Sequence, residues 1–166
     1  SVVLFVSCKD SLETVTSDSY VEIQKVLSIN PASLDNYAAQ GKPAYVNKDN
    51  TAANPITDKA ATLGRVLFYD KNLSINNTIA CASCHKQEFA FGDTATSSLG
   101  VENGRTERHS MRLINSRYAV EAKFFWNERA ASLEAQTTMP IVDHLEMGFS
   151  GQTGRGNITS LITKLN

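Results

Sequence analysis

The chain has 166 residues, which is enough for one domain with a hydrophobic core. Hydrophobic residues make up 42% of it, charged residues 20%, and its formal net charge at pH 7 is −1. This balance excludes an extended basic surface that follows a phosphate backbone, so we expect no nucleic acid among its partners.

The first eight residues, SVVLFVSC, form an apolar run that ends in a small residue and a cysteine, and a polar stretch follows. This pattern is similar to the end of a bacterial lipoprotein signal peptide, in which Cys8 becomes the lipidated first residue. The run is too short to span a bilayer. We therefore expect residues 1–8 to be a signal-peptide remnant and the protein to be periplasmic, with Cys8 as the candidate lipid anchor. The alternative is a buried apolar strand with Cys8 in the core.

Residues 9–55 are weakly patterned, and we expect them to be a lead segment or linker. Apolar residues between Val21 and Ile29 predict one short helix, which Asn30-Pro31 ends. The stretch NKDNTAANP at residues 47–55 is polar and predicts a loop.

Residues 56–166 carry clearer helical patterns and form the expected domain, which we interpret as cut short at its C-terminal end. Thr57 is a candidate N-cap for a helix over residues 58–69. A short helix is predicted for residues 79–86 and a long loop for residues 92–108. The apolar stripe of the first of these helices consists of Ala60, Leu63, Gly64 and Leu67.

Two more helices are predicted near the end of the chain. Ser132 can cap a helix over residues 133–139, which Pro140 is expected to end. Asn157 can cap a last helix whose apolar face consists of Ile158, Leu161, Ile162 and Leu165. Because alternating strand patterns are scarce, the predicted fold class is all-α.

The most specific motif is Cys81-Ala82-Ser83-Cys84-His85. On a helical turn, positions i and i+3 face the same side, so both thiols can reach the two vinyl groups of one porphyrin. The imidazole that follows can ligate the iron, so the motif predicts one covalent haem c per chain. The alternative is a redox or metal-binding CxxC that happens to precede a histidine. With two cysteines used this way only Cys8 remains, so no disulfide framework is expected.

Several further motifs follow in a fixed order, and together they resemble the N-terminal haem domain of the bacterial di-haem cytochrome c peroxidases, relatives of the methylamine-utilisation di-haem enzymes. The resemblance covers roughly residues 56–165 and implies a cytochrome c-like haem domain with long loops. The segments that carry it are LGRVLFYD at 63–70, FGD at 91–93, Arg108, LIN at 113–115, FFWNER at 124–129, LEAQ at 133–136, Pro140 and EMG at 146–148.

The resemblance implies a role for each matching position. His85 would ligate the peroxide-binding haem from its proximal side, and Glu146 would be the distal acid and base. Gln136 would help orient peroxide, and Trp126 would lie toward a second haem. One carboxyl group can move a proton between the two peroxide oxygens when an apolar pocket raises its pKa.

Plainer interpretations exist for each of these residues. Glu146 could be a solvated surface residue, Gln136 an exposed helix position and Trp126 a core residue. Arg108 or Arg129 is expected to pair with a haem propionate or an acidic carboxylate, although a solvated face is the simpler interpretation of the arginines.

The chain departs from the family pattern at two places. Many members have an iron-ligating histidine in the loop after the haem motif, but residues 86–108 contain none. We therefore expect a distal side that is open or water-bound. His109 stands where the family commonly has asparagine near a calcium site, and imidazole is a poor ligand for calcium, so calcium binding is doubtful. Other candidate sixth ligands are His109 itself, Met111, Met139 and Met147, for which surface or packing roles are favoured.

The favoured function is a c-type haem peroxidase that reduces hydrogen peroxide to water with electrons from a small cytochrome or cupredoxin. The alternatives are a single-haem electron-transfer cytochrome c, which would keep the sixth iron position filled, and a related di-haem oxidase acting on another substrate. Only one CxxCH is present. Since family members carry a second haem domain, we interpret this chain as the peroxide-binding half.

Overall fold

The computed structural model describes residues 20–119 and 123–166, so the predicted lipobox and Cys8 lie outside the described residues. The chain forms two compact units, residues 1–34 and residues 35–166. In the first unit, helix α1 (Val21–Leu27) ends where Ser28 adopts a left-handed conformation and its N–H bonds the Gln24 carbonyl. The predicted short helix before Asn30-Pro31 is therefore confirmed.

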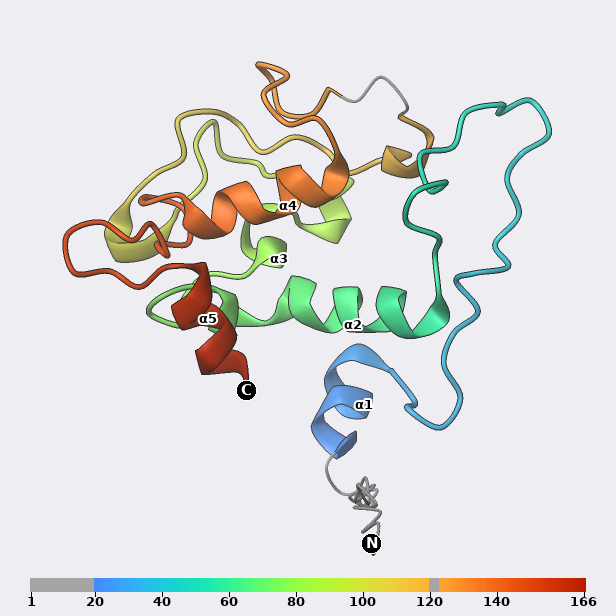
Figure 1. The fold of residues 1–166 in the computed structure, drawn as a ribbon, viewed down its shortest axis with the longest axis horizontal. Helices are drawn as coiled ribbons and strands as arrows, with labels where there is room; N and C mark the ends of the chain where they lie inside the picture. The colour runs from blue at the N-terminus through green and yellow to red at the C-terminus, as the bar shows by residue number, and fades with distance from the viewer. Residues whose placement is uncertain (1–19, 120–122) are drawn as a thin grey trace, which may run out of the picture. The chain divides into compact units, whose positions relative to one another are not determined.

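The second unit is built from short helices joined by long connections (Figure 1). Across residues 20–119 and 123–166 there are no strands, only three isolated bridges. The all-α prediction is confirmed for this part of the chain. The elements are α2 (Asp58–Tyr69), η2 (Lys71–Leu73), α3 (Cys81–Cys84), η3 (Gln87–Phe89), η4 (Val101–Asn103), η5 (Ser116–Tyr118), α4 (Leu133–Val142) and α5 (Ile158–Leu165).

The predicted N-caps are present. The Thr57 side chain accepts a hydrogen bond from the Ala60 N–H at 3.2 Å, and α2 covers the predicted residues 58–69. Asn157 caps α5 through the Ser160 N–H, and Ser132 caps α4 through the Ala135 N–H. Each cap satisfies a donor that the first helical turn leaves unpaired.

Two sequence predictions about helices are corrected. Pro140 does not end α4, which continues to Val142 because buried Ile141 holds the last turn in the core. The haem-motif helix is shorter than predicted, since Ala80 and His85 are already non-helical. Helix α5 follows its predicted cap Asn157, with Leu161 buried and Ile158, Ile162 and Leu165 39–57% exposed.

The core lies where the helices meet the connections that follow them. Leu67 and Cys81 pack against its edge, which joins α2 and α3 to it. The buried cluster consists of Leu73, Ile79, Val101, Ile141, Met147, Phe149 and Leu161. Three of these seven positions, Ile79, Met147 and Phe149, lie in loops, so apolar burial holds loop segments in the core as well as helices.

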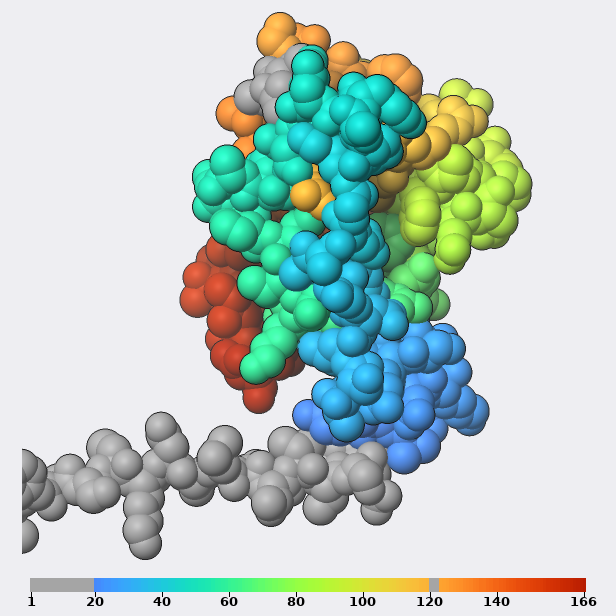
Figure 2. Space-filling model, turned by 90° about the vertical axis from the view of Figure 1, so that its right-hand side faces the viewer, coloured from blue at the N-terminus to red at the C-terminus, as the bar shows by residue number. Residues whose placement is uncertain are grey.

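Residues 35–55 belong to the same compact unit as the helices. Figure 2 shows this segment as a blue-to-cyan band across the surface of the unit. Arg117 donates from Nε and Nη2 to Asp49 Oδ2 at 3.0 and 2.8 Å. The Asn50 amide donates to the carbonyl oxygens of Ser116 and Ala119. These contacts tie the band to η5.

Candidate active site

Helix α3 presents Cys81 and Cys84 one turn apart, and neither forms a disulfide. Both thiols are partly buried, and burial raises the pKa of each. Cys84 Sγ lies 3.8 Å from the Leu99 carbonyl oxygen, so the second cysteine faces the connection that leads to η4. Two unpaired thiols one turn apart are the donor arrangement that a covalent porphyrin requires.

The His85 ring is held in one tautomer. Its Nδ1 lies 2.7 Å from the Phe91 carbonyl oxygen. Because a carbonyl only accepts, Nδ1 carries the proton, and the lone pair of Nε2 is left for a metal. The two thiols and this nitrogen form a donor set that fits haem c, with Cys81 and Cys84 for attachment and His85 for the iron.

The loop between His85 and Phe91 is tight and strained. Ala90 and Phe91 both have φ of 57°, a left-handed conformation that costs an ordinary residue roughly 1–2 kcal/mol. Two backbone hydrogen bonds close the loop, from the Lys86 N–H to the Gly92 carbonyl and from the Phe91 N–H to the Lys86 carbonyl, each at 2.9 Å. The left-handed turn aims the Phe91 carbonyl at His85.

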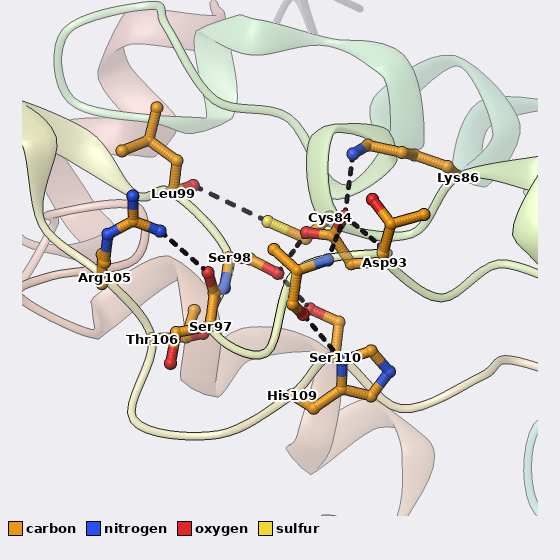
Figure 3. A network of polar contacts seen from close by, with 12 residues as sticks. Cys84, Lys86, Asp93, Ser97, Ser98, Leu99, Arg105, Thr106, His109 and Ser110 are labelled. Atoms are coloured by element: carbon orange, nitrogen blue, oxygen red, sulfur yellow. Dashed lines mark hydrogen bonds and ion pairs between the residues drawn. The ribbon is translucent and has the colours of Figure 1, made fainter.

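Asp93 is the centre of a polar network just beyond this loop (Figure 3). Its buried carboxylate accepts from Lys86 Nζ at 2.8 Å, Ser98 Oγ at 2.6 Å and the Thr94 N–H at 2.7 Å. Burial alone would raise the pKa of Asp93, but these donors hold that pKa well below its usual range. Ser98 Oγ also lies 2.8 Å from Ser110 Oγ, which brings a second loop to the network.

The segment of residues 143–147 around Glu146 is held by hydrogen bonds to both the N–H and the carbonyl of Glu146. The Asp143 carboxylate accepts from the N–H groups of Leu145 and Glu146, and the Val101 N–H donates to the Glu146 carbonyl at 3.0 Å. Its neighbour Met147 is buried in the core, which confirms apolar packing for that methionine. The backbone around Glu146 is therefore fixed by hydrogen bonds and by an apolar anchor.

Gly100 allows this segment to approach. A Cβ at position 100 would lie 1.8 Å from the Leu145 carbonyl oxygen, which no side chain tolerates. The φ of Gly100 is −107°, so steric contact and not backbone conformation requires glycine there.

The carboxyl group of Glu146 is partly buried. Burial raises its pKa, Asp143 raises it further, and the positive charge of Arg129 lowers it. The Glu146 charge also contributes to the raised pKa of the Cys84 thiol, so these two side chains lie within electrostatic range of each other. A partly buried carboxyl group with a raised pKa is a candidate for proton transfer.

The other predicted site residues are more dispersed. Gln136 is partly buried on α4, and its side chain has no hydrogen bond among the described residues. Trp126 is 58% exposed and donates from Nε1 to the His109 carbonyl at 2.8 Å. Arg129 is exposed, bonds Asn127 and lies 3.6 Å over the Phe125 ring.

The candidate propionate partner Arg108 and the alternative iron ligand His109 can be placed as well. Arg108 is exposed. His109 Nδ1 lies 2.9 Å from the Ala95 carbonyl, so this histidine ties two loops together. In the described part of the chain, no three His, Cys, Asp or Glu side chains gather in a way that could hold a metal ion. No helix there is long and apolar enough to cross a membrane.

Sequence reasoning missed the Asp93 network, the Phe91 carbonyl and Gly100. Asp93 and Gly100 stand in the predicted long loop, where composition gave no indication of burial. The signal that could have found Asp93 is the FGD motif at 91–93, in which an acidic residue follows an apolar residue and glycine.

Comparison with known proteins agrees with this geometry. Residues 58–166 match the family model described as di-haem cytochrome c peroxidase. The chain belongs to this family. It is 34% identical over 113 residues to the methylamine utilization protein MauG of Methylophilus methylotrophus, covering 68% of this chain and 31% of that protein. It is 29% identical over 118 residues to the cytochrome c551 peroxidase of Pseudomonas aeruginosa, covering 71% and 34%.

A solved structure is similar too. The crystal structure of a MauG-like protein associated with microbial copper homeostasis is 36% identical, with a TM-score of 0.59, and the match covers 64% of this chain and 31% of that one. The chain spans about a third of the length of these relatives. Membership of the family implies haem c as the cofactor and supports a haem peroxidase.

Proposed function

We propose that this chain is the peroxide-binding part of a c-type haem peroxidase that reduces hydrogen peroxide to water. The observation that carries the proposal is the Glu146 carboxyl group, whose pKa is raised by burial and which lies within electrostatic range of Cys84. Cys81 and Cys84 would attach one haem c, and His85 would ligate it through Nε2. The bound haem would supply the iron at which peroxide is reduced.

Glu146 is proposed to move the proton. Peroxide reduction takes up two electrons and two protons and releases two waters, and cleavage of the O–O bond needs a proton on the departing oxygen. A carboxylate that accepts the proton of the near oxygen and donates it to the far oxygen performs both transfers without a second group. Gln136, whose amide has both a donor and an acceptor, is proposed to orient the peroxide.

The electrons are proposed to come one at a time from a small cytochrome or cupredoxin, with Trp126 on the path toward a second haem. Its 58% exposure places the indole at the surface, where a further domain could reach it. Arg129 and Arg108 are proposed to pair with haem propionates. The single CxxCH of this chain supplies one haem, so we expect the isolated chain to bind peroxide but to turn over poorly with cytochrome donors. A periplasmic location is proposed with it.

The test is Glu146→Gln in the haem-loaded protein, with Glu88→Gln as the matched control because Glu88 is an exposed glutamate close to the haem motif. Stopped-flow mixing with peroxide should show a loss of roughly 10²–10⁴-fold in the cleavage rate for Glu146→Gln and no change for Glu88→Gln. The absorption and EPR spectra before mixing should be unchanged and high-spin. An unchanged rate in Glu146→Gln would remove the proposed proton-transfer role, and a purely low-spin spectrum of the unmodified protein would remove the open distal side.

A second candidate is oxidation of another substrate with the same peroxide chemistry, which the similarity to MauG proteins favours. The two are separated by adding reduced cytochrome after peroxide. Rapid return to the starting spectrum supports the peroxidase. A long-lived oxidised species that the cytochrome does not reduce supports oxidation of another substrate.

A further inference from the structure

The Asp93 carboxylate is buried and accepts several hydrogen bonds. It is 9% exposed, and it receives hydrogen bonds from an ammonium, a hydroxyl and a backbone N–H group within 2.8 Å. A buried carboxylate is held in place only when its charge is paired and its lone pairs are satisfied, as they are here. The position of the Asp93 carboxylate is therefore fixed by hydrogen bonds from three directions.

Asp93 lies at the base of the loop that orients His85. Lys86 follows His85 directly, and Asp93 lies two residues beyond Phe91, so the ion pair of 2.8 Å joins the two ends of the loop. Inside that clamp, the left-handed turn at Phe91 directs its carbonyl toward His85 Nδ1 at 2.7 Å. The strained turn has to be held from outside, and the Lys86–Asp93 pair is in the position to hold it.

The same carboxylate reaches the second cysteine. Ser98 is fully buried and donates to Asp93 Oδ2, and the next residue, Leu99, carries the carbonyl that faces Cys84 Sγ at 3.8 Å. Figure 3 shows Asp93 between the Lys86 ammonium on one side and Ser98 on the other. One side chain thus supports the surroundings of both the imidazole and the neighbouring cysteine.

We propose that Asp93 is a positioning residue for His85, acting through Lys86 and the Phe91 carbonyl to set the strength of the hydrogen bond at Nδ1. The inference rests on the proposed role of His85 as the iron ligand. A strong hydrogen bond at Nδ1 makes the imidazole a better electron donor through Nε2 and stabilises the oxidised iron. Loosening the clamp therefore weakens the iron–histidine bond and raises the reduction potential.

The test must separate the effect of positioning His85 on the reduction potential from the direct effect of changing a nearby charge. Asp93→Asn removes a negative charge and would raise the potential on either account. Lys86→Met removes a positive charge, which by charge alone would lower the potential, whereas loosening of the clamp raises it. Glu88→Gln, on the same loop but exposed, is the matched control for charge near the motif.

The measurements are the reduction potential by spectroelectrochemistry and the iron–histidine stretching frequency of the reduced protein by resonance Raman, on the full haem-loaded chain. We expect both Asp93→Asn and Lys86→Met to raise the potential and to lower the stretching frequency, with Glu88→Gln unchanged and Asp93→Glu partly restoring the frequency. A lower or unchanged potential in Lys86→Met, with an unshifted frequency, overturns the inference even if Asp93→Asn fails to load haem. Absence of an iron–histidine band in the unmodified protein would instead defeat the proposed function.

Discussion

Replacing Gly100 by alanine is a direct test of how the Glu146 segment is placed. The new Cβ would lie 1.8 Å from the Leu145 carbonyl oxygen, so the two chain segments must separate by about 1.2 Å to reach the closest contact of 3.0 Å that real Cβ atoms show (3.0 − 1.8). The backbone conformation of Gly100 suits alanine, so nothing but this contact is changed. Separation also breaks the 3.0 Å hydrogen bond from the Val101 N–H to the Glu146 carbonyl.

Two costs add. Overpacking costs roughly 1–3 kcal/mol and the lost hydrogen bond about 1 kcal/mol, so the free energy of unfolding should fall by about 2–4 kcal/mol. For a chain of this size that corresponds to a fall in Tm of roughly 4–16 °C. Because Glu146 moves by an ångström relative to Cys84 and His85, the rate of peroxide cleavage should fall by about 10²-fold at a temperature where the variant is still folded.

The assay is thermal unfolding by circular dichroism together with stopped-flow peroxide cleavage at 25 °C. The matched control is Gly64→Ala in α2, where a Cβ meets nothing within 4 Å. There alanine should raise the free energy of unfolding by roughly 0.5–1 kcal/mol and leave the cleavage rate unchanged. A Gly100→Ala protein that keeps both its Tm and its cleavage rate would refute the reasoning, since the close contact would then not be placing Glu146.

Two further predictions concern the loops around the site. The pKa of Asp93 is lowered in the folded state relative to the ordinary value of about 3.9, so its contribution to stability is present above that value and is lost as the pH falls below it. Urea unfolding at pH 7 and pH 3 should therefore show a larger loss of unfolding free energy for the unmodified protein than for Asp93→Asn. Equal losses in the two proteins would contradict this. His109→Phe removes the imidazole that bonds the Ala95 carbonyl and so loosens the loop at residue 109, whose backbone carbonyl accepts from Trp126 Nε1. Because Trp126 is the only tryptophan, acrylamide should quench the protein's fluorescence more readily in this variant. The control His144→Phe should leave the quenching unchanged.

The helices could be predicted because their N-terminal ends are determined by residues close together in the sequence. Thr57, Ser132 and Asn157 each cap the helix they were expected to cap, since a cap needs only a side-chain oxygen and the N–H groups of the next turn. The prediction that Pro140 ends α4 was wrong, because the proline ring removes only one hydrogen bond near the end of the helix and the burial of Ile141 outweighs that loss. Capping and helix propensity cannot predict the burial of Ile141, because the residues that bury it are far away in the chain.

The site was predictable only as a set of residue types. The spacing of Cys81, Cys84 and His85 shows which atoms can meet one haem, but it does not show what orients the imidazole. That acceptor is a backbone carbonyl, which every residue has, and Phe91 supplies it through a left-handed turn that an aromatic residue rarely adopts. The role of Gly100 is equally hidden in the sequence, because glycine in a loop ordinarily signals a turn and here signals a close approach of two segments.

The stretch from Ser98 to Val101 joins the two sides of the site. Ser98 bonds the Asp93 carboxylate on the His85 side, the Leu99 carbonyl faces Cys84 Sγ, and Val101 donates to the Glu146 carbonyl. Because these contacts come from three residues within one stretch of four, a shift of this stretch moves the support of His85 and that of Glu146 together. A peroxidase needs a fixed distance between the iron ligand on one face and the proton-transfer group on the other. Ser98 and Val101, at 0% and 1% exposure, hold this stretch in the core, which in the proposed function would fix that distance.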